Sequence, residues 1–120
     1  MICFDTNILI YIANGTLNED IVGNEQIIYP SIVKLESLGY QHIRSVEEHR
    51  IRDLLATLTA IPLTDQIIEQ AIKLRQGKSM GLGDAIVAAT ALENKSRLWT
   101  ANIEDFSDIE GLKLVNPLTG

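Results

Sequence analysis

The amino-acid sequence predicts an α/β fold in which helices cover both faces of a parallel sheet. Short apolar runs typical of buried strands alternate with longer stretches of helical periodicity along the chain. Such alternation favours parallel strands joined by crossover helices. The 120 residues contain neither an internal repeat nor a linker, and their number suits a single core. We therefore expect residues 1–120 to form one domain.

The first quarter of the chain predicts a strand, a helix and a second strand. Residues 1–4 are an apolar run, and residues 6–13 follow with helical spacing and end at an Asn-Gly stop signal. Residues 26–29 form the second apolar run. The next helix begins at a Pro-Ser pair and runs to about residue 41, with Ser31 as the expected N-cap.

The middle of the chain predicts a further helix and a strand at the edge of the sheet. Ser45 and Glu48 have the spacing of a capping box, which opens a helix ending near residue 55. Residues 59–63 predict the third strand. Pro62 near its end cannot donate a backbone hydrogen bond, so we expect this strand at a sheet edge.

Two helices and two strands complete the predicted fold. Thr64 or Asp65 caps a helix that reaches Gly77, and a glycine-rich turn opens an alanine-rich helix that extends to residue 94 or 95. Residues 97–100 predict the fourth strand, and residues 112–115 predict a short fifth strand.

The composition indicates a folded protein of a reducing compartment. Apolar residues make up 46% of the chain and charged residues 22%, which is typical of globular domains. The single cysteine, Cys3, cannot form an intrachain disulfide. No signal peptide is expected, because the N-terminus lacks a basic region and Asp5 interrupts its apolar run. No run approaches the roughly 18 apolar residues of a membrane span. We expect a soluble cytoplasmic protein.

The net charge of −6 and a pI near 4.8 argue, taken alone, against a polyanionic partner. The charges are unevenly distributed, however, because seven of the ten basic residues lie between residues 34 and 78 and acids dominate both ends. This pattern has two interpretations. The basic residues lie on ordinary solvated helix faces, or they form a positive rim beside an acidic pocket.

Four acidic residues occupy positions that a parallel sheet brings together. Each comes just after a predicted strand or in the first turns of the helix that follows, and they are Asp5, Glu36, Asp84 and Asp105. The carboxyl ends of parallel strands meet at one edge, where ligands bind. Each position has an alternative explanation: helix capping for Asp5 and Asp84, a salt bridge for Glu36, and an acidic surface loop for Asp105. Their joint placement favours a cation site.

Glu36 has the most informative surroundings of the four. Helical spacing places it on one face with Ile32, Leu35, Gly39 and Tyr40, so we expect its carboxylate at the border of an apolar stripe. An unpaired charge beside apolar side chains is costly. Either a basic residue or a metal ion should therefore compensate it.

Four motifs follow one another along the chain: Asp5-Thr6-Asn7, the mid-chain Glu36, GLGDAIVAATAL at residues 81–92, and Thr100-x-Asn102-x-x-Asp105-Phe106. In this order they resemble the signature of the PIN-domain nucleases, and within them the VapC-type toxins of toxin–antitoxin pairs. The resemblance implies a three-layer fold with a central five-stranded parallel sheet in the order 3-2-1-4-5. It also implies a metal-dependent ribonuclease that dimerises and is inhibited by a small antitoxin.

The resemblance assigns roles to individual residues. Asp5, Glu36 and Asp84 are implied as ligands of Mg²⁺ or Mn²⁺, with Asp105 or Asn102 at the fourth position, of which the charged Asp105 is preferred. Thr6, Asn7, Thr100 and Asn102 are implied as supporting residues. Carboxylates without a Cys or His cluster suit such hard cations, and Cys3, His42 and His49 are too scattered for zinc.

Two other functions fit an acidic α/β domain. A receiver-like signalling domain also has an acidic Mg²⁺ pocket, but it pairs its acids after the first strand and places a lysine after the fifth. Here one acid ends the first strand, and Lys113 lies within the last predicted strand. A PIN-fold module that binds an ion or a partner's arginine without catalysis is the second alternative.

Overall fold

Five parallel strands form one sheet in the order β3-β2-β1-β4-β5, which confirms the fold class and the strand order that the resemblance implied. The computed structural model describes residues 1–119. The strands are β1 (Ile2–Phe4), β2 (Ile27–Pro30), β3 (Thr59–Ile61), β4 (Arg97–Trp99) and β5 (Leu114–Val115). As predicted, β3 lies at an edge, and Pro62 follows directly after it.

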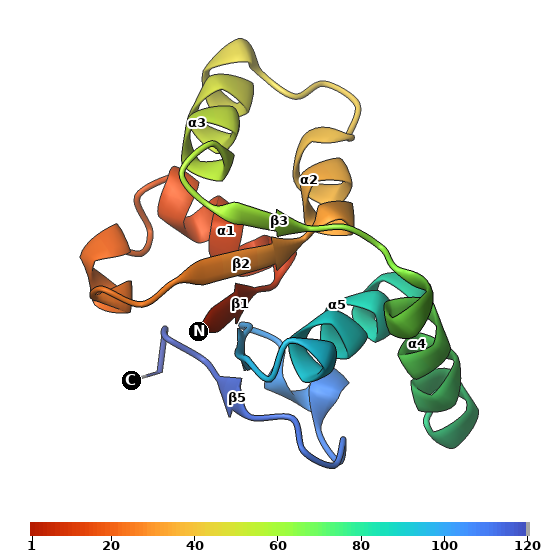
Figure 1. Ribbon diagram of the computed structural model, residues 1–120. Coiled ribbons are helices and arrows are strands. Elements are labelled where there is room, and N and C mark those ends of the chain that lie inside the picture. The colour runs from red at the N-terminus through yellow and green to blue at the C-terminus, as the bar shows by residue number, and fades with distance from the viewer. Residues whose placement is uncertain (120) are drawn as a thin grey trace.

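Helices cover the sheet on both sides (Figure 1). They are α1 (Thr6–Ala13), α2 (Ser31–Leu38), α3 (Ser45–Leu55), α4 (Asp65–Gly77) and α5 (Leu82–Glu93). The first three pack against one another, whereas α5 contacts β2 and β4 and carries α4 on its outer side. The chain moves from β1 outward to β3 and then returns to β4. Right-handed crossovers place helices on opposite faces when the direction of progression reverses.

The core is built around the central strand and the small side chains of α5. All three residues of β1 are buried, because this strand is paired on both sides and covered on both faces. Four alanines of α5 are completely buried: Ala85, Ala88, Ala89 and Ala91. Their small size lets α5 approach the sheet and α4 closely. As a result, the first turn of α5 lies at the carboxyl edge of the sheet.

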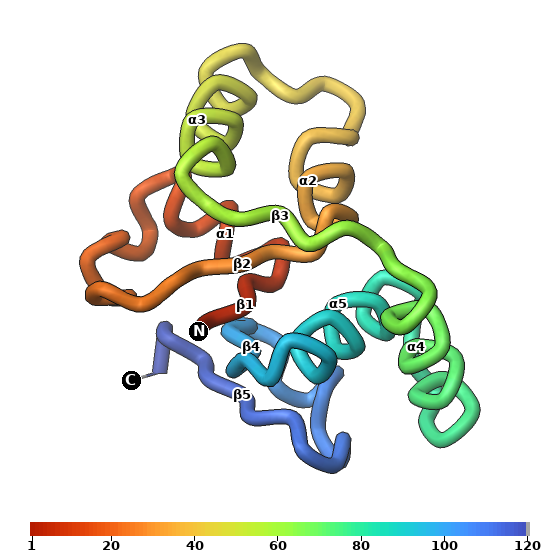
Figure 2. The backbone as a smooth tube through the Cα atoms, in the orientation of Figure 1, coloured from red at the N-terminus to blue at the C-terminus, as the bar shows by residue number. Residues whose placement is uncertain are grey.

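The same edge contains the start of α2. Figure 2 shows the chain leaving β2 directly into α2, while α5 begins at this end of the sheet and runs back across it. Parallel strands all point their carboxyl ends toward this edge. The fold therefore gathers the turns after β1, β2 and β4 and the N-terminus of α5.

Two of the three expected helix caps are wrong. Ser31 is already the first residue of α2, and Pro30 occupies the N-cap position without a side-chain hydrogen bond. Ser45 is likewise the first residue of α3, after an uncapped Arg44, and Glu48 pairs with Arg52 at 2.8 Å. In both cases the helix begins at the serine itself, whereas the capping rule requires the serine to precede the first helical residue.

The predicted cap on α4 is confirmed, because the Thr64 hydroxyl accepts the Ile67 amide at 3.2 Å. Other boundaries differ by one to three residues; α2 ends at Leu38 rather than near residue 41, with Gly39 as its C-cap. The sequence also missed two short 3₁₀ helices, η1 (Glu19–Val22) and η2 (Ile103–Phe106). Within residues 1–119, no helix is long and apolar enough to cross a bilayer.

Candidate functional site

Asp5 lies at the carboxyl end of the central strand and is held by both of its oxygen atoms. Oδ1 accepts the Thr6 amide at 2.8 Å, which caps α1, and Oδ2 accepts the Thr100 hydroxyl at 2.8 Å. The residue is only 6% exposed. Helices leave β1 and enter β4 from opposite faces, so Asp5 occupies the switch point where open α/β sheets bind ligands.

Thr100 and Asn7 join the two chain segments that meet there. The Thr100 side chain is completely buried; its hydroxyl donates to Asp5 and accepts the Asn102 amide at 3.0 Å. Asn7 Oδ1 accepts the Ala101 amide at 3.3 Å. These bonds fix the start of α1 to the segment after β4. The structure thus brings together the residues that the sequence proposed as supporting, with the Asn102 side chain itself exposed.

Glu36 reaches the same place from α2. Its Oε1 accepts the Thr6 hydroxyl at 2.8 Å, and its Oε2 lies so close to Gly83 that a β-carbon there would be 2.9 Å away. The expected apolar stripe is wrong in one respect: Leu35 is 68% exposed and Tyr40 is 42% exposed. The helix buries the opposite side instead, because α2 packs on α1 and α3 through Val33 and Ser37.

Asp84 and Asp105 complete an acidic cluster. Asp84 is partly buried in the first turn of α5, and its pKa is raised by burial first and then by the charges of Asp5, Asp105 and Glu36. Burial also raises the pKa of Asp5, and the charges of Glu36 and Asp105 add to this rise. Hydrogen bonds from Thr100 and Thr6 oppose it. The four carboxylates therefore act on one another electrostatically.

No basic side chain compensates this cluster among residues 1–119. The ion pairs described there all lie elsewhere: Met1–Glu25, Arg97–Glu25, Arg44–Glu47 and Arg52–Glu48. The basic partner considered for Glu36 is therefore not seen. Arg44 and Arg52, two of the basic residues considered for a positive rim or for ordinary helix faces, form exposed pairs along α3. Such pairs contribute little to stability.

The cluster suits a hard divalent cation in its chemistry and its place in the fold. As arranged in residues 1–119, no three Asp, Glu, His or Cys side chains stand together so that they could hold a metal ion. Burial and the charges of the other carboxylates raise the pKa of Asp5 and of Asp84, so a cation at this edge of the sheet would relieve the repulsion. Oxygen donors of this kind match Mg²⁺ or Mn²⁺. In donor type the set therefore fits such an ion, and Asp5, Glu36, Asp84 and Asp105 are the residues that would hold it.

Two features of the site escaped sequence reasoning. One is the contact between Gly83 and Glu36. The other is a hydrogen bond of 2.6 Å from Lys78 Nζ to the carbonyl oxygen of Ser107, which ties the connection before α5 to the end of η2. Its partners are 29 residues apart, and no local pattern marks either of them.

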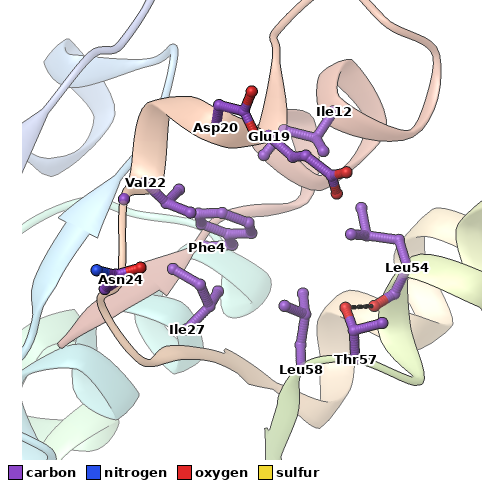
Figure 3. A pocket seen from close by; sticks show the side chains of 11 residues that line it. Phe4, Ile12, Glu19, Asp20, Val22, Asn24, Ile27, Leu54, Thr57 and Leu58 are labelled. Atoms are coloured by element: carbon purple, nitrogen blue, oxygen red, sulfur yellow. Dashed lines mark hydrogen bonds between the residues drawn. The ribbon is translucent and has the colours of Figure 1, made fainter.

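The molecule has depressions outside this cluster. Figure 3 shows a cavity of about 500 Å³ with an apolar floor that includes Phe4, Ile27 and Leu58, and with Glu19 and Asp20 of η1 at its rim. None of the predicted site residues lines it. A second groove, of about 450 Å³, runs between α4 and α5 and is lined mostly by leucine and isoleucine. Neither depression is lined by Asp5, Glu36, Asp84 or Asp105.

The sequence profile of the PIN domain matches residues 2–112. Because this match spans nearly the whole chain, the chain belongs to the PIN domain family. Its likeness to VapC-type toxins within that family is also confirmed by solved structures with the same fold. No curated protein sequence matches the chain significantly.

Three of these structures are representative. A toxin–antitoxin complex from Klebsiella pneumoniae has a chain 32% identical, with a TM-score of 0.78 and 98% of each chain covered. VapBC2 from Rickettsia felis, bound to a promoter DNA fragment, is 25% identical, with a TM-score of 0.82 and coverage of 97% of this chain and 98% of that one. VapBC-1 from Haemophilus influenzae, at 24% identity, has a TM-score of 0.73, covers 97% of this chain and 98% of that one, and shows the fold alone.

Proposed function

We propose that this chain is a metal-dependent endoribonuclease and the toxin of a type II toxin–antitoxin pair, acting in the cytoplasm. The proposal is carried by the charges of Asp5, Glu36, Asp84 and Asp105, which act on one another at the carboxyl edge of a PIN-domain sheet. None of these carboxylates pairs with a basic side chain among residues 1–119. Membership of the PIN domain family supports nuclease chemistry, and the toxin–antitoxin complexes among its structural neighbours support the biological setting.

Each acidic residue has a distinct part in this proposal. Asp5 and Asp84 would hold Mg²⁺ or Mn²⁺, and Glu36 and Asp105 would be further ligands. The bound ion would acidify a water molecule and neutralise charge on the phosphodiester. Thr6 and Thr100 hold the carboxylates of Asp5 and Glu36, while Asn7 and the Asn102 amide fix the segments around them. The acidic cluster alone repels RNA, so substrate approach also needs the ion and nearby basic side chains.

Removal of divalent metal should abolish cleavage. The purified chain incubated with a mixed pool of single-stranded RNA should produce fragments in Mg²⁺ or Mn²⁺. The rate should fall by at least about 100-fold in EDTA, because the phosphate then meets uncompensated carboxylates. Adding back excess Mn²⁺ should restore it. Cleavage that persists unchanged in EDTA would contradict the metal-dependent mechanism.

A non-catalytic binding module remains the competing function, because the geometry of the cluster also suits a bound ion or a partner's arginine. Calorimetric titration with Mn²⁺, followed by digestion of several RNA pools, separates the two. Binding of Mn²⁺ without cleavage of any pool would favour the module.

The proposed protein partner is a small antitoxin, as in the complexes from K. pneumoniae and R. felis. An acidic cluster on a chain of net charge −6 is complementary to a basic segment of such a partner. The neighbouring open reading frame should encode a small protein that suppresses RNA cleavage when it is added in equimolar amount.

We also propose that the chain forms a homodimer through the groove between α4 and α5. Four large apolar side chains around it are exposed: Leu63 at 48%, Ile68 at 40%, Ile72 at 44% and Leu82 at 62%. Exposed apolar clusters of this kind mark interaction surfaces. A two-fold axis lets one such patch cover itself, so a second copy is the simplest occupant.

Replacing Ile72 with glutamate should convert the dimer to a monomer. A charge buried in an apolar interface without a partner costs several kcal/mol, so the dissociation constant should rise by at least about 100-fold. Light scattering coupled to size exclusion measures the change. Ile21→Glu, at an apolar residue that is 47% exposed on η1, is the matched control and should leave the mass unchanged. A dimer that persists in Ile72→Glu would place the interface elsewhere.

A further inference from the structure

The carboxylate of Glu36 lies directly over the α-carbon of Gly83, in the first turn of α5. A β-carbon added to Gly83 would be 2.9 Å from Oε2, 3.6 Å from Cδ and 3.9 Å from Oε1 of Glu36. The first of these distances is shorter than carbon and oxygen can tolerate. Because Oε1 also accepts the Thr6 hydroxyl at 2.8 Å, the carboxylate is held between the first turns of α1 and α5.

The backbone does not explain why residue 83 is glycine. The residues with positive φ include Gly15, Gly23 and Gly111, whereas Gly83 lies within the regular helix α5. Alanine is the better helix former, so a glycine in a helix reduces stability unless the space is needed. At Gly77 and Gly81 an added β-carbon would meet nothing within 4 Å. Of Gly77, Gly81 and Gly83, only Gly83 therefore has no room for a β-carbon.

We propose that Gly83 is a positioning residue: its missing side chain leaves the space in which Glu36 lies beside Asp84 and keeps its bond to Thr6. This inference rests on the proposed function only for its consequence in metal binding. The steric part stands on the contact itself. Because the clashing atom is the end of a flexible side chain, Gly83→Ala should fold and displace Glu36 rather than disrupt α5.

A thermal double-mutant cycle tests the steric part without metal or RNA. In the Glu36→Ala background the clashing carboxylate is gone, so Gly83→Ala should raise the Tm by about 3 °C through the better helix propensity of alanine. In the wild-type background the same change should raise it by less than about 1 °C, because the displaced carboxylate loses its bond to Thr6. Equal increases in both backgrounds would overturn the proposal, whatever the enzyme does.

Metal titration tests the functional consequence. Gly83→Ala should weaken Mn²⁺ binding, measured by calorimetry without RNA, by about 10-fold, and it should lower RNA cleavage in parallel. The matched control, Gly77→Ala, should bind Mn²⁺ as the wild type does. In the Glu36→Asp background, the carboxylate is one methylene shorter and clears the added β-carbon. There, Gly83→Ala should weaken binding by less than about twofold.

The outcomes separate this inference from the proposed function. If the wild type neither binds Mn²⁺ nor cleaves RNA, the proposed function fails, and the thermal cycle still decides whether Gly83 positions Glu36. If the wild type binds and cleaves while Gly83→Ala behaves identically in both assays, the positioning role is wrong and the nuclease proposal is unaffected.

Discussion

Replacing Asp84 with asparagine is expected to reduce RNA cleavage by at least about 100-fold while making the metal-free protein more stable. The proposed ion loses a charged ligand, and asparagine cannot replace that charge. The stability should rise because the pKa of Asp84 is raised by burial and by the charges of Asp5, Asp105 and Glu36. Because Asp84 is only partly buried, solvent screens this repulsion, and the loss of a favourable charge at the start of α5 offsets part of the gain. The net increase in the free energy of unfolding should therefore be about 0.5 kcal/mol.

The pH dependence of stability gives this prediction a definite sign. A carboxyl group whose pKa is raised on folding binds its proton more tightly in the native state than in the unfolded chain. Below the ordinary Asp pKa of roughly 3.9 the group is protonated in both states, so it costs no stability. As pH rises from there through the raised folded-state pKa, ionisation costs more in the native state than in the unfolded chain, and stability is lost. Asp5 contributes in the same direction. Chemical denaturation should show a smaller loss of stability over this window in Asp84→Asn than in the wild type.

Asp65 provides the matched control for this experiment. It is also an acidic residue in the first turn of a helix, α4, but it lies outside the cluster. Asp65→Asn should keep full cleavage activity and lose a few tenths of a kcal/mol, because the favourable interaction with the helix dipole is weakened. If Asp84→Asn cleaves RNA normally, or destabilises the metal-free protein as Asp65→Asn does, the proposed metal site is wrong.

The second large effect is expected at Thr100. Thr100→Val keeps the shape of a completely buried side chain but removes the hydroxyl that donates to Asp5 and accepts from the Asn102 amide. Leaving these groups without a partner should lower the free energy of unfolding by about 2 kcal/mol, or the Tm by roughly 8 °C. The pKa of Asp5 should rise further, because the bond from Thr100 lowers it. Cleavage should fall by at least about 10-fold through misplacement of Asp5.

Two variants show whether the Thr100 hydroxyl itself is responsible. Thr100→Ser retains it and should keep most of the activity. Thr90→Val removes another buried hydroxyl, which donates to the Ile86 carbonyl within α5, and should leave cleavage unchanged. Thermal unfolding and RNA digestion measure both effects. If Thr100→Val matches Thr90→Val in activity, Thr100 does not hold a catalytic carboxylate.

Local patterns were sufficient for the elements of the fold and insufficient for their exact ends. Short apolar runs identified all five strands. In β1 and β2 the cause is burial along the whole strand, whereas β3 is largely exposed and β5 only half-buried. The capping rules failed at Ser31 and Ser45, where the neighbouring backbone, rather than a side chain, determines where the helix begins. The order of the strands came from family resemblance, because pairing depends on contacts between distant segments that no local period encodes.

The candidate site shows the same division. The types of the four acidic residues and their places after strands indicated a cation site, because parallel strands bring their carboxyl ends to one edge. The resemblance offered Asn102 or Asp105 for the fourth position and preferred Asp105, and this choice stays a prediction. The charge of Asp105 does act on Asp5 and Asp84 in the folded chain. The sequence also left open whether a basic residue pairs with Glu36.

The identity and chain order of the residues were enough to predict an α/β sheet with carboxylates at its edge. Three-dimensional packing alone determined which atoms meet: Thr100 with Asp5, Thr6 with Glu36, and Glu36 with the bare α-carbon of Gly83. The reason is physical. Hydrophobic periodicity is a property of short segments, whereas hydrogen bonds and steric gaps arise between segments that are far apart in the chain and meet only after the core has packed.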